Sequence, residues 1–204
     1  MKMITERQLE SINMAAEFAA CAHNNYNHTG TAQTRKCGTV PYYAHPAYIA
    51  TLVALYGGSH KAQIAAYLHD VLEDCDSRWR EECELLVLYD LPLPIPEREE
   101  IWAMVNALTK NMEITPRSAR NANAIMQAIN GPKETILVKI CDRLANLMQF
   151  RGLTLEFLEH TYLPETEDLV RAFEPHVGDY TDAYTALIAR MRNVKAIFPS
   201  ESIR

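Results

Sequence analysis

One segment, Glu134 to Phe150, constrains the fold most because it is apolar around most of its circumference when drawn as a helix. Its large apolar side chains are Ile136, Leu137, Ile140, Leu144, Leu147 and Met148. A helix that is hydrophobic on nearly all sides is normally buried against other elements. We therefore predict that this helix lies inside the molecule.

The rest of the chain also favours helices. Glycine occurs only seven times, helix-forming residues are frequent, and neither an alternating strand pattern nor an Asn-Gly hairpin stands out. Thr5 and Gln8 form a capping box for a first helix that ends near Cys21. Further helices are expected from Pro46 to the glycines at 57 and 58, and over His60–Cys75, Asp76 to before Pro92, Glu97–Thr109, Ala119–Ile129, Leu155–Phe173 with a kink or stop at Pro164, and Tyr180–Ile197. The predicted fold class is all-α.

Length and charge narrow the class of protein further. A chain of 204 residues suits one domain, residues 1–204, and it has no apolar run near the roughly 20 residues of a membrane span. The first eight residues do not resemble a secretory signal, so a soluble, cytoplasmic protein without membrane contact is expected. The net charge of −6 argues against nucleic-acid binding, and five cysteines without a CxxC pair argue against a disulfide framework or a cysteine zinc site.

Four ionisable residues of the segment His60–Cys75 share one arc when this segment is drawn as a helix, opposite an apolar arc: His69, Asp70, Glu73 and Asp74. A charged arc usually faces water, and taken alone this is the simpler interpretation. A metal-binding or catalytic face is the alternative.

Asp142 and Asn146 lie one turn apart on the apolar helix, in a polar stripe with Lys139 and Arg143. A buried carboxylate needs a partner because an isolated buried charge is costly. The partner is either Arg143 or Lys139 in a structural salt bridge, or a cation shared with the His69-Asp70 pair. His45, just before Pro46, would on its own be read as a structural histidine. The ordered combination of His, His-Asp and Asp favours the metal site.

The strings YYAHPA, AAYLHDVLED and VKICDRLANL resemble the three signatures of the HD-domain hydrolases of the Rel/Spo type, which degrade the alarmone (p)ppGpp. The stretch RKCGTVPYYAHP and the tripeptide LTK, Leu108 to Lys110, resemble further segments of that family. The resemblance covers about Ala15 to Phe150 and implies a single HD-domain helical bundle. Because the chain leaves no room for synthetase and regulatory domains, we expect a small stand-alone hydrolase, a possible functional counterpart of an alarmone synthetase.

By this resemblance, His45, His69, Asp70 and Asp142 bind one divalent metal, most often Mn²⁺ in the family. Such an ion lowers the pKa of a bound water and neutralises phosphate charge. The resemblance also gives Glu73 and Asp74 the catalytic role of positioning and deprotonating the water or protonating the leaving 3′ oxygen.

The same resemblance implies a purine nucleotide substrate. Asn146 would contact the ribose, Arg35 would stack on the purine, and Lys36 would hold phosphates. Lys110, Arg117 and Arg120 are weaker phosphate-binding candidates, since the local match is loose and a solvated arginine is the simpler interpretation of the last two. The chain departs from the family in a longer polar link between His23 and Arg35, which includes His28 and could reshape the base pocket.

Three functions fit these residues. The favoured one is metal-dependent 3′-pyrophosphate hydrolysis of (p)ppGpp or a related purine alarmone. A general HD nucleotidase or phosphodiesterase, including an NADPH 2′-phosphatase, would share the metal centre without needing Glu73, Asp74, Asn146, Arg35 and Lys36 together. A non-catalytic HD module that binds a nucleotide or a partner would not need the full set of ligands and acid/base residues. The sequence does not indicate an oligomeric state.

Overall fold

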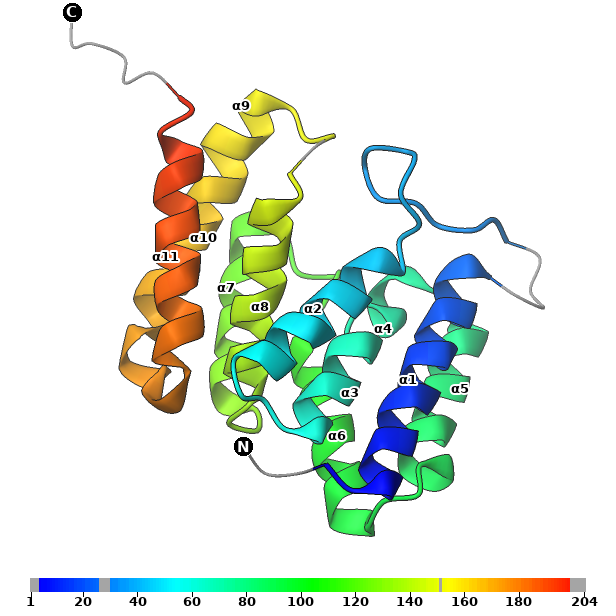
Figure 1. Cartoon of the computed structure of the whole chain (residues 1–204). Coiled ribbons are helices and arrows are strands. Elements are labelled where there is room, and N and C mark those ends of the chain that lie inside the picture. Colours follow the sequence, from blue (N-terminus) through cyan, green and yellow to red (C-terminus); the bar gives the residue numbers. More distant parts are fainter. Residues whose placement is uncertain (1–3, 26–29, 151, 199–204) are drawn as a thin grey trace, which may run out of the picture.

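The computed structural model describes residues 4–25, 30–150 and 152–198, and in this part of the chain the fold is helical, as predicted (Figure 1). The α-helices are α1 (Glu6–Asn24), α2 (Ala44–Leu55), α3 (His60–Leu68), α4 (Val71–Asp74), α5 (Ser77–Leu85), α6 (Ile95–Leu108), α7 (Arg117–Asn130), α8 (Thr135–Met148), α9 (Leu155–Phe157), α10 (Leu163–Phe173) and α11 (Thr181–Lys195). Short π-helical turns, η1 (Leu86–Asp90) and η2 (Leu158–Tyr162), and 3-10 turns, η3 (Glu174–His176) and η4 (Gly178–Tyr180), join or extend them. An isolated bridge pairs Thr34 with Pro41.

Helix α8 is the buried helix that the sequence predicts. It packs against α2, α3, α6, α7 and α11, and it passes between α2 and α11 in Figure 1. Every residue from Thr135 to Ala145 is buried, including Lys139, Asp142 and Arg143. Three charged side chains are therefore buried on this central helix.

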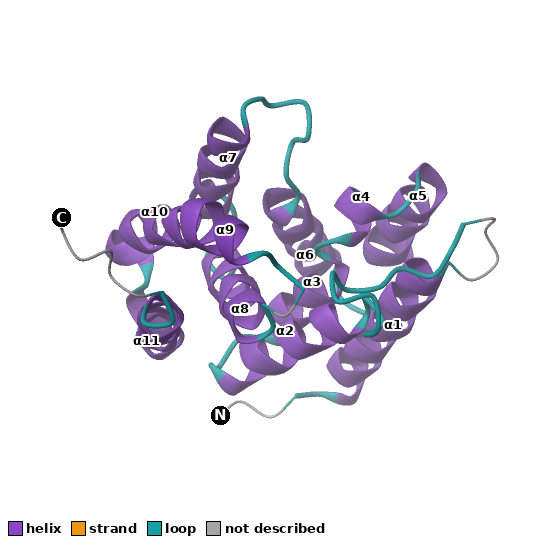
Figure 2. Ribbon diagram, turned by 90° about the horizontal axis from the view of Figure 1, so that it is seen from above, coloured by secondary structure: helices purple, strands orange, loops and turns teal. Residues whose placement is uncertain are grey.

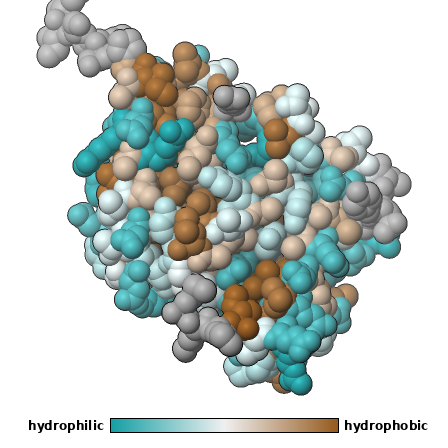
Figure 3. Space-filling view, in the orientation of Figure 1, coloured by the Kyte–Doolittle hydropathy of each residue, from teal (hydrophilic) through white to brown (hydrophobic). Residues whose placement is uncertain are grey.

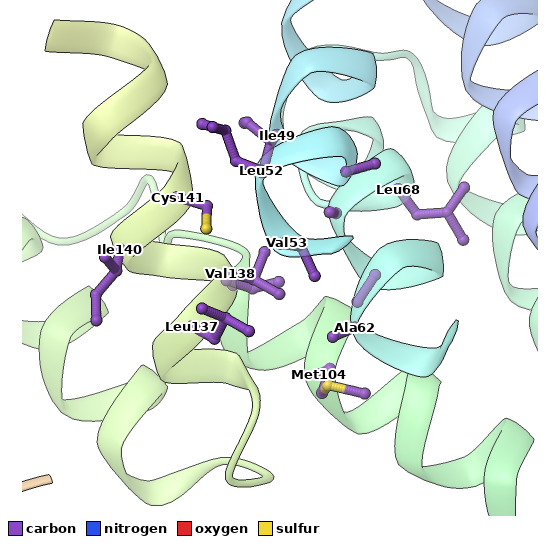
Figure 4. Packing of buried hydrophobic residues seen from close by; sticks show 14 of the residues in the cluster. Ile49, Leu52, Val53, Ala62, Leu68, Met104, Leu137, Val138, Ile140 and Cys141 are labelled. Carbon is purple, nitrogen blue, oxygen red and sulfur yellow. The ribbon is translucent and has the colours of Figure 1, made fainter. Parts of the chain in front are cut away.

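The apolar side of α8 meets α2 directly. In Figure 4, Leu137, Val138 and Cys141 of α8 lie toward Val53 and the neighbouring side chains of α2. These residues belong to one continuous core that extends through α3 and α6. The packing fixes α2 and α8 relative to each other and, with them, the polar residues that each carries.

Local signals account for several helix ends. The capping box forms as predicted: Gln8 N donates to Thr5 Oγ1, and the Gln8 side chain accepts from Thr5 N. Helix α1 runs three residues beyond Cys21 because Asn25, with φ of 56°, adopts the left-handed conformation and closes the last turn. Helix α2 begins two residues before Pro46, since a proline within the first turn loses no helical hydrogen bond.

The predicted helix over His60–Cys75 is wrong at its centre. Helix α3 ends at Leu68, and His69 and Asp70 form a turn before α4 begins at Val71. Both residues are buried, 2% and 7% exposed, so they do not belong to a solvent-exposed helix face. Helical periodicity alone could not reveal the break, because hydrogen bonding resumes at once with Asp74 N donating to Asp70 O.

The interruption expected at Pro164 is observed as a change of helix type. The turn before it, η2, is π-helical, and α10 starts at Leu163 with the proline in its first turn. Proline has no N–H to donate, and its ring crowds the carbonyl groups of the preceding turn. The wider π-helical turn η2 relieves this crowding.

The face in Figure 3 carries hydrophobic side chains in separate clusters among hydrophilic ones. None of the described helices is long and apolar enough to cross a membrane. All five cysteines are free, and Cys75, Cys83 and Cys141 are buried.

Candidate active site

A cleft of about 460 Å³ opens beside the C-terminal half of α8. Seen from above (Figure 2), α4, α7, α8, α9 and the loop that follows α1 surround this end of the molecule. The cleft is lined by polar residues from these elements and from η2 and α10: Thr34, Arg35, Lys36, Tyr42, His45, Asp70, Glu73, Asp74, Lys110, Arg117, Arg120, Asn121, Lys139, Asp142, Arg143, Asn146, Gln149, Tyr162 and Glu165. Of the twelve site residues predicted from the sequence, eleven line the cleft. His69 is buried and does not line it.

His45, His69 and Asp142 each offer one ligand atom within 4.8 Å of the others, so this group can hold a metal ion. They come from α2, from the turn after α3 and from α8, and all three are at most 9% exposed. The packing of α2 and α3 against α8 therefore brings together residues nearly one hundred positions apart.

The His69 ring is oriented as a metal-binding imidazole requires. Its Nδ1 lies 2.8 Å from the carbonyl oxygen of Ala66 and donates to it, so in the neutral ring the lone pair is on Nε2. Nε2 is buried without a hydrogen-bond partner among the described residues, although Asp70 Oδ2 lies 3.1 Å away. A backbone acceptor that fixes the tautomer is the usual support for a ligating histidine.

Asp70, the fourth predicted ligand, is not part of this three-residue group but lies beside its two histidines. Its Oδ2 lies 3.1 Å from His69 Nε2 and 3.9 Å from His45 Nε2. Burial tends to lower the pKa of His69, but Asp70 and Asp142 outweigh it and raise that pKa to about 9. Burial tends to raise the pKa of Asp70, but the His69 and His45 rings hold it well below its usual range. The site therefore attracts positive charge, and two imidazoles with two carboxylates fit a divalent ion.

Both carboxylate oxygens of Asp142 contact neighbouring side chains. Oδ1 lies 3.2 Å from His45 Nε2 and accepts from Asn146 Nδ2 at 2.6 Å, while Oδ2 accepts from Lys139 Nζ at 3.3 Å. Burial tends to raise the pKa of Asp142, but Lys139 and His45 hold it well below its usual range. The salt bridge with Lys139 thus exists beside the histidine contacts, so the two interpretations of Asp142 are compatible.

Glu73 lies at the cleft wall in a tight pair with Lys110. The Lys110 backbone N–H donates to Oε1 at 2.6 Å, and its Nζ donates to Oε2 at 2.8 Å. Burial tends to lower the pKa of Lys110, but Glu73 and Asp70 outweigh it and raise that pKa. Lys110 therefore contacts a candidate catalytic carboxylate, which the sequence did not indicate.

Asp74, at the end of α4, is joined to Asp70 by Tyr42, a residue that sequence reasoning missed. Tyr42 Oη lies 2.7 Å from Asp70 Oδ2 and 2.6 Å from Asp74 Oδ2. Burial and both carboxylates raise the pKa of Tyr42, so the phenol keeps its proton. The available signal was the position of Tyr42 three residues before His45.

Arg35 and Asn146 meet across the cleft. Arg35 Nη2 donates to Asn146 Oδ1 at 2.7 Å, and its guanidinium carbon lies 5.4 Å from the centre of the Tyr42 ring. Asn146 therefore links Arg35 to Asp142. Lys36 lies over the Phe157 ring at 4.9 Å. His28, in the extended link, lies outside the described residues.

Two further cations, Arg117 and Arg143, contact Glu165 or Tyr162, which had no sequence signal. Arg117 donates to both oxygens of Glu165, at 2.6 and 3.0 Å, and so is not a free loop arginine. Arg143 lies 4.4 Å from the Tyr162 ring centre and does not pair with Asp142. Arg120 donates to the carbonyl of Met112 at 3.3 Å.

The sequence model of the HD domain family matches residues 15–170, so the chain belongs to that family. The chain is similar to a guanosine-3′,5′-bis(diphosphate) 3′-pyrophosphohydrolase of Aquifex aeolicus, 34% identical over 142 residues, which cover 68% of this chain and 17% of that protein. It is also similar to the enzyme of the same name, MESH1, of Danio rerio, 27% identical over 150 residues, 72% of this chain and 71% of that one. The chain spans less than a fifth of the length of the first bacterial relatives that it matches.

The fold has a match among solved structures. A structure described as a metazoan ortholog of SpoT that hydrolyzes ppGpp matches with a TM-score of 0.69 at 21% identity, over 95% of this chain and 98% of that one. The expected HD-domain helical fold is therefore confirmed.

Proposed function

We propose that this protein is a metal-dependent 3′-pyrophosphohydrolase that removes pyrophosphate from (p)ppGpp or a closely related purine alarmone. The observation that carries the proposal is the buried group of His45, His69 and Asp142 beside the carboxylates of Glu73 and Asp74. Relatives named for this reaction support the choice of substrate. The proposal includes a cytoplasmic setting in which the enzyme opposes an alarmone synthetase.

One divalent ion, Mn²⁺ in our proposal, would be held by His45, His69, Asp70 and Asp142. The unpartnered Nε2 of His69 and the low pKa of both carboxylates support this set. When bound, such an ion supplies Lewis-acid chemistry, neutralising phosphate charge and making water more acidic.

Two carboxylates would transfer protons during hydrolysis. Glu73 and Asp74 are on α4, directly after Asp70, and both line the cleft. We assign them the positioning and deprotonation of the attacking water and the protonation of the leaving 3′ oxygen. Tyr42 and Lys110, through their contacts with Asp74 and Glu73, orient the two groups.

The charge of the cleft supports a polyanionic substrate. Among the described residues, seven cations line it against five carboxylates, although the whole chain has a net charge of −6. The cations are Arg35, Lys36, Lys110, Arg117, Arg120, Lys139 and Arg143. In our assignment Arg35 stacks on the purine, Asn146 contacts the ribose, and Lys36, Lys110, Arg117 and Arg120 hold phosphates.

The test is turnover by protein loaded with Mn²⁺ on ppGpp, ppApp, NADPH and GDP, with pyrophosphate and phosphate measured separately. We expect pyrophosphate release from a 3′-pyrophosphorylated purine nucleotide, loss of activity with a chelator, and at least about 100-fold less activity in Asp142→Asn. Asp179→Asn, which alters an exposed carboxylate paired with Lys133, is the matched control and should retain full activity. Phosphate release from NADPH alone would favour the 2′-phosphatase, and the absence of divalent-ion binding would refute the mechanism.

A further inference from the structure

Gln33, in the polar segment between His23 and Arg35, is held by all four of its polar groups. Its backbone N–H donates to His23 O at 2.8 Å, and its carbonyl accepts from Tyr42 N at 2.9 Å. Its side-chain Nε2 donates to the carbonyl of Asp74 at 2.5 Å, and its Oε1 lies 2.7 Å from His23 Nδ1. Gln33 thus connects the end of α1 to the last residue of α4.

The orientation of the Gln33 amide follows from its partners. A carbonyl oxygen can only accept, so the end of the amide that faces Asp74 must be the NH₂ group. The oxygen then faces His23, which must carry its proton on Nδ1. The His23 ring is fully buried in α1 and cannot turn freely. The donor to Asp74 is therefore held in one direction.

Tyr42 holds the side chain of the same aspartate. Its ring lies between the rings of His23, with centroids 4.6 Å apart, and His45, with centroids 6.1 Å apart. Its hydroxyl has one proton and contacts oxygens of two carboxylates, Asp70 and Asp74. The Tyr42 hydroxyl oxygen therefore holds Oδ2 of Asp70 and Oδ2 of Asp74 close to itself.

Helix α4 needs such anchors. It has four residues, fewer than a stable isolated helix requires, and Asp74 at its end is exposed. We propose that Gln33 and Tyr42 are positioning residues for Asp74, with Gln33 fixing its backbone and Tyr42 its carboxylate. The catalytic part of this inference rests on the proposed function. It gives Gln33 a role at the reaction site.

Kinetics of the full chain loaded with Mn²⁺ test the catalytic consequence. We expect Tyr42→Phe and Gln33→Met each to lower kcat about tenfold or more, with KM changed less than about threefold. In an Asp74→Asn background Tyr42→Phe should cause little further loss, because it acts through Asp74. An equal loss of kcat from Tyr42→Phe in the unaltered protein and in Asp74→Asn would overturn the role of Tyr42 as a positioning residue for Asp74.

Matched controls separate positioning from loss of packing. Tyr43→Phe removes a neighbouring hydroxyl from a ring that stacks on Tyr67, and Gln63→Met changes a glutamine that donates to Gly58 O, away from the cleft. Both should retain the kcat of the unaltered protein. Tyr42→Phe keeps the aromatic ring, so it remains informative if Gln33→Met folds poorly.

Hydrogen exchange tests positioning without any substrate. Gln33→Met and Tyr42→Phe should speed amide exchange in peptides covering residues 71–76 by at least about threefold, and the controls should not. Unchanged exchange in both variants would overturn the positioning role whatever happens to kcat, and faster exchange with unchanged kcat would overturn its catalytic part. If the unaltered protein hydrolyses no nucleotide, the proposed function fails, while the exchange result still decides whether these residues hold α4.

Discussion

At the residue scale, the cleft holds carboxylates in different surroundings. Asp70 and Asp142 are buried among imidazoles and a lysine, whereas Glu73 is paired at both oxygens with Lys110. Asp142 belongs to the group that could hold an ion and Asp70 lies beside the two histidines of that group, whereas Glu73 contacts Lys110 instead. The two kinds of carboxylate should respond differently to neutralisation.

We predict that Glu73→Gln leaves Mn²⁺ affinity within about threefold of the unaltered protein but lowers kcat about 100-fold, because a neutral amide cannot accept a proton from water. Isothermal titration with Mn²⁺ and steady-state kinetics measure the two effects. The control is Glu100→Gln, which removes an equivalent partner of Lys61 outside the cleft and should change neither. A large loss of Mn²⁺ affinity in Glu73→Gln would make Glu73 a ligand instead.

At the element scale, the turn between α2 and α3 approaches α8 very closely. A Cβ added to Gly58 would lie 2.4 Å from Val53 Cγ1, 2.9 Å from Leu137 Cδ2 and 2.9 Å from the Val53 carbonyl oxygen. A backbone atom cannot move aside as a flexible side chain can. The glycine therefore allows the turn after α2 to pack closely against Leu137 of α8.

Gly58→Ala should lower the free energy of unfolding by about 1–3 kcal/mol because the added methyl overfills this contact. Urea denaturation followed by circular dichroism measures the change. Ser118→Ala, at an exposed position in α7, should stay within about 0.5 kcal/mol of the unaltered protein. Equal midpoints for the two variants would mean that α2 can shift away from α8 without cost.

At the scale of the whole molecule, the proposed ligands join elements that are distant in sequence. His45 belongs to α2, His69 and Asp70 follow α3, and Asp142 belongs to the central α8. An ion bound by all of them would cross-link the native arrangement and could not bind the unfolded chain equally well. Binding should therefore stabilise the fold.

Mn²⁺ at about 100 times its dissociation constant should add about 2.7 kcal/mol, which corresponds to a rise in Tm of about 5–10 °C for a chain of this size. Differential scanning fluorimetry with and without a chelator measures the shift. Asp142→Asn should lose the shift, whereas Asp179→Asn should keep it. A Tm of the unaltered protein that does not change with Mn²⁺ would argue against the proposed ligands.

Much of this protein could be predicted from the sequence because it depends on local periodicity. The helical class, the capping box at Thr5 and the burial of α8 follow from the spacing of apolar and capping residues, which acts over a few turns. Ordered motifs predicted a set of His45, His69, Asp70 and Asp142, and the folded chain brings His45, His69 and Asp142 into one group with Asp70 beside it.

Tertiary structure alone decided the rest, since it depends on residues that meet across long stretches of chain. Periodicity predicts an unbroken helix through His69 and Asp70, yet packing around α8 turns both inward. The partners of Glu73 and Asp74, namely Lys110 and Tyr42, are 37 and 32 positions away in the sequence. Residue types can indicate a metal site with acid and base groups, but only the packing of distant helices selects which cation or hydroxyl holds each carboxylate.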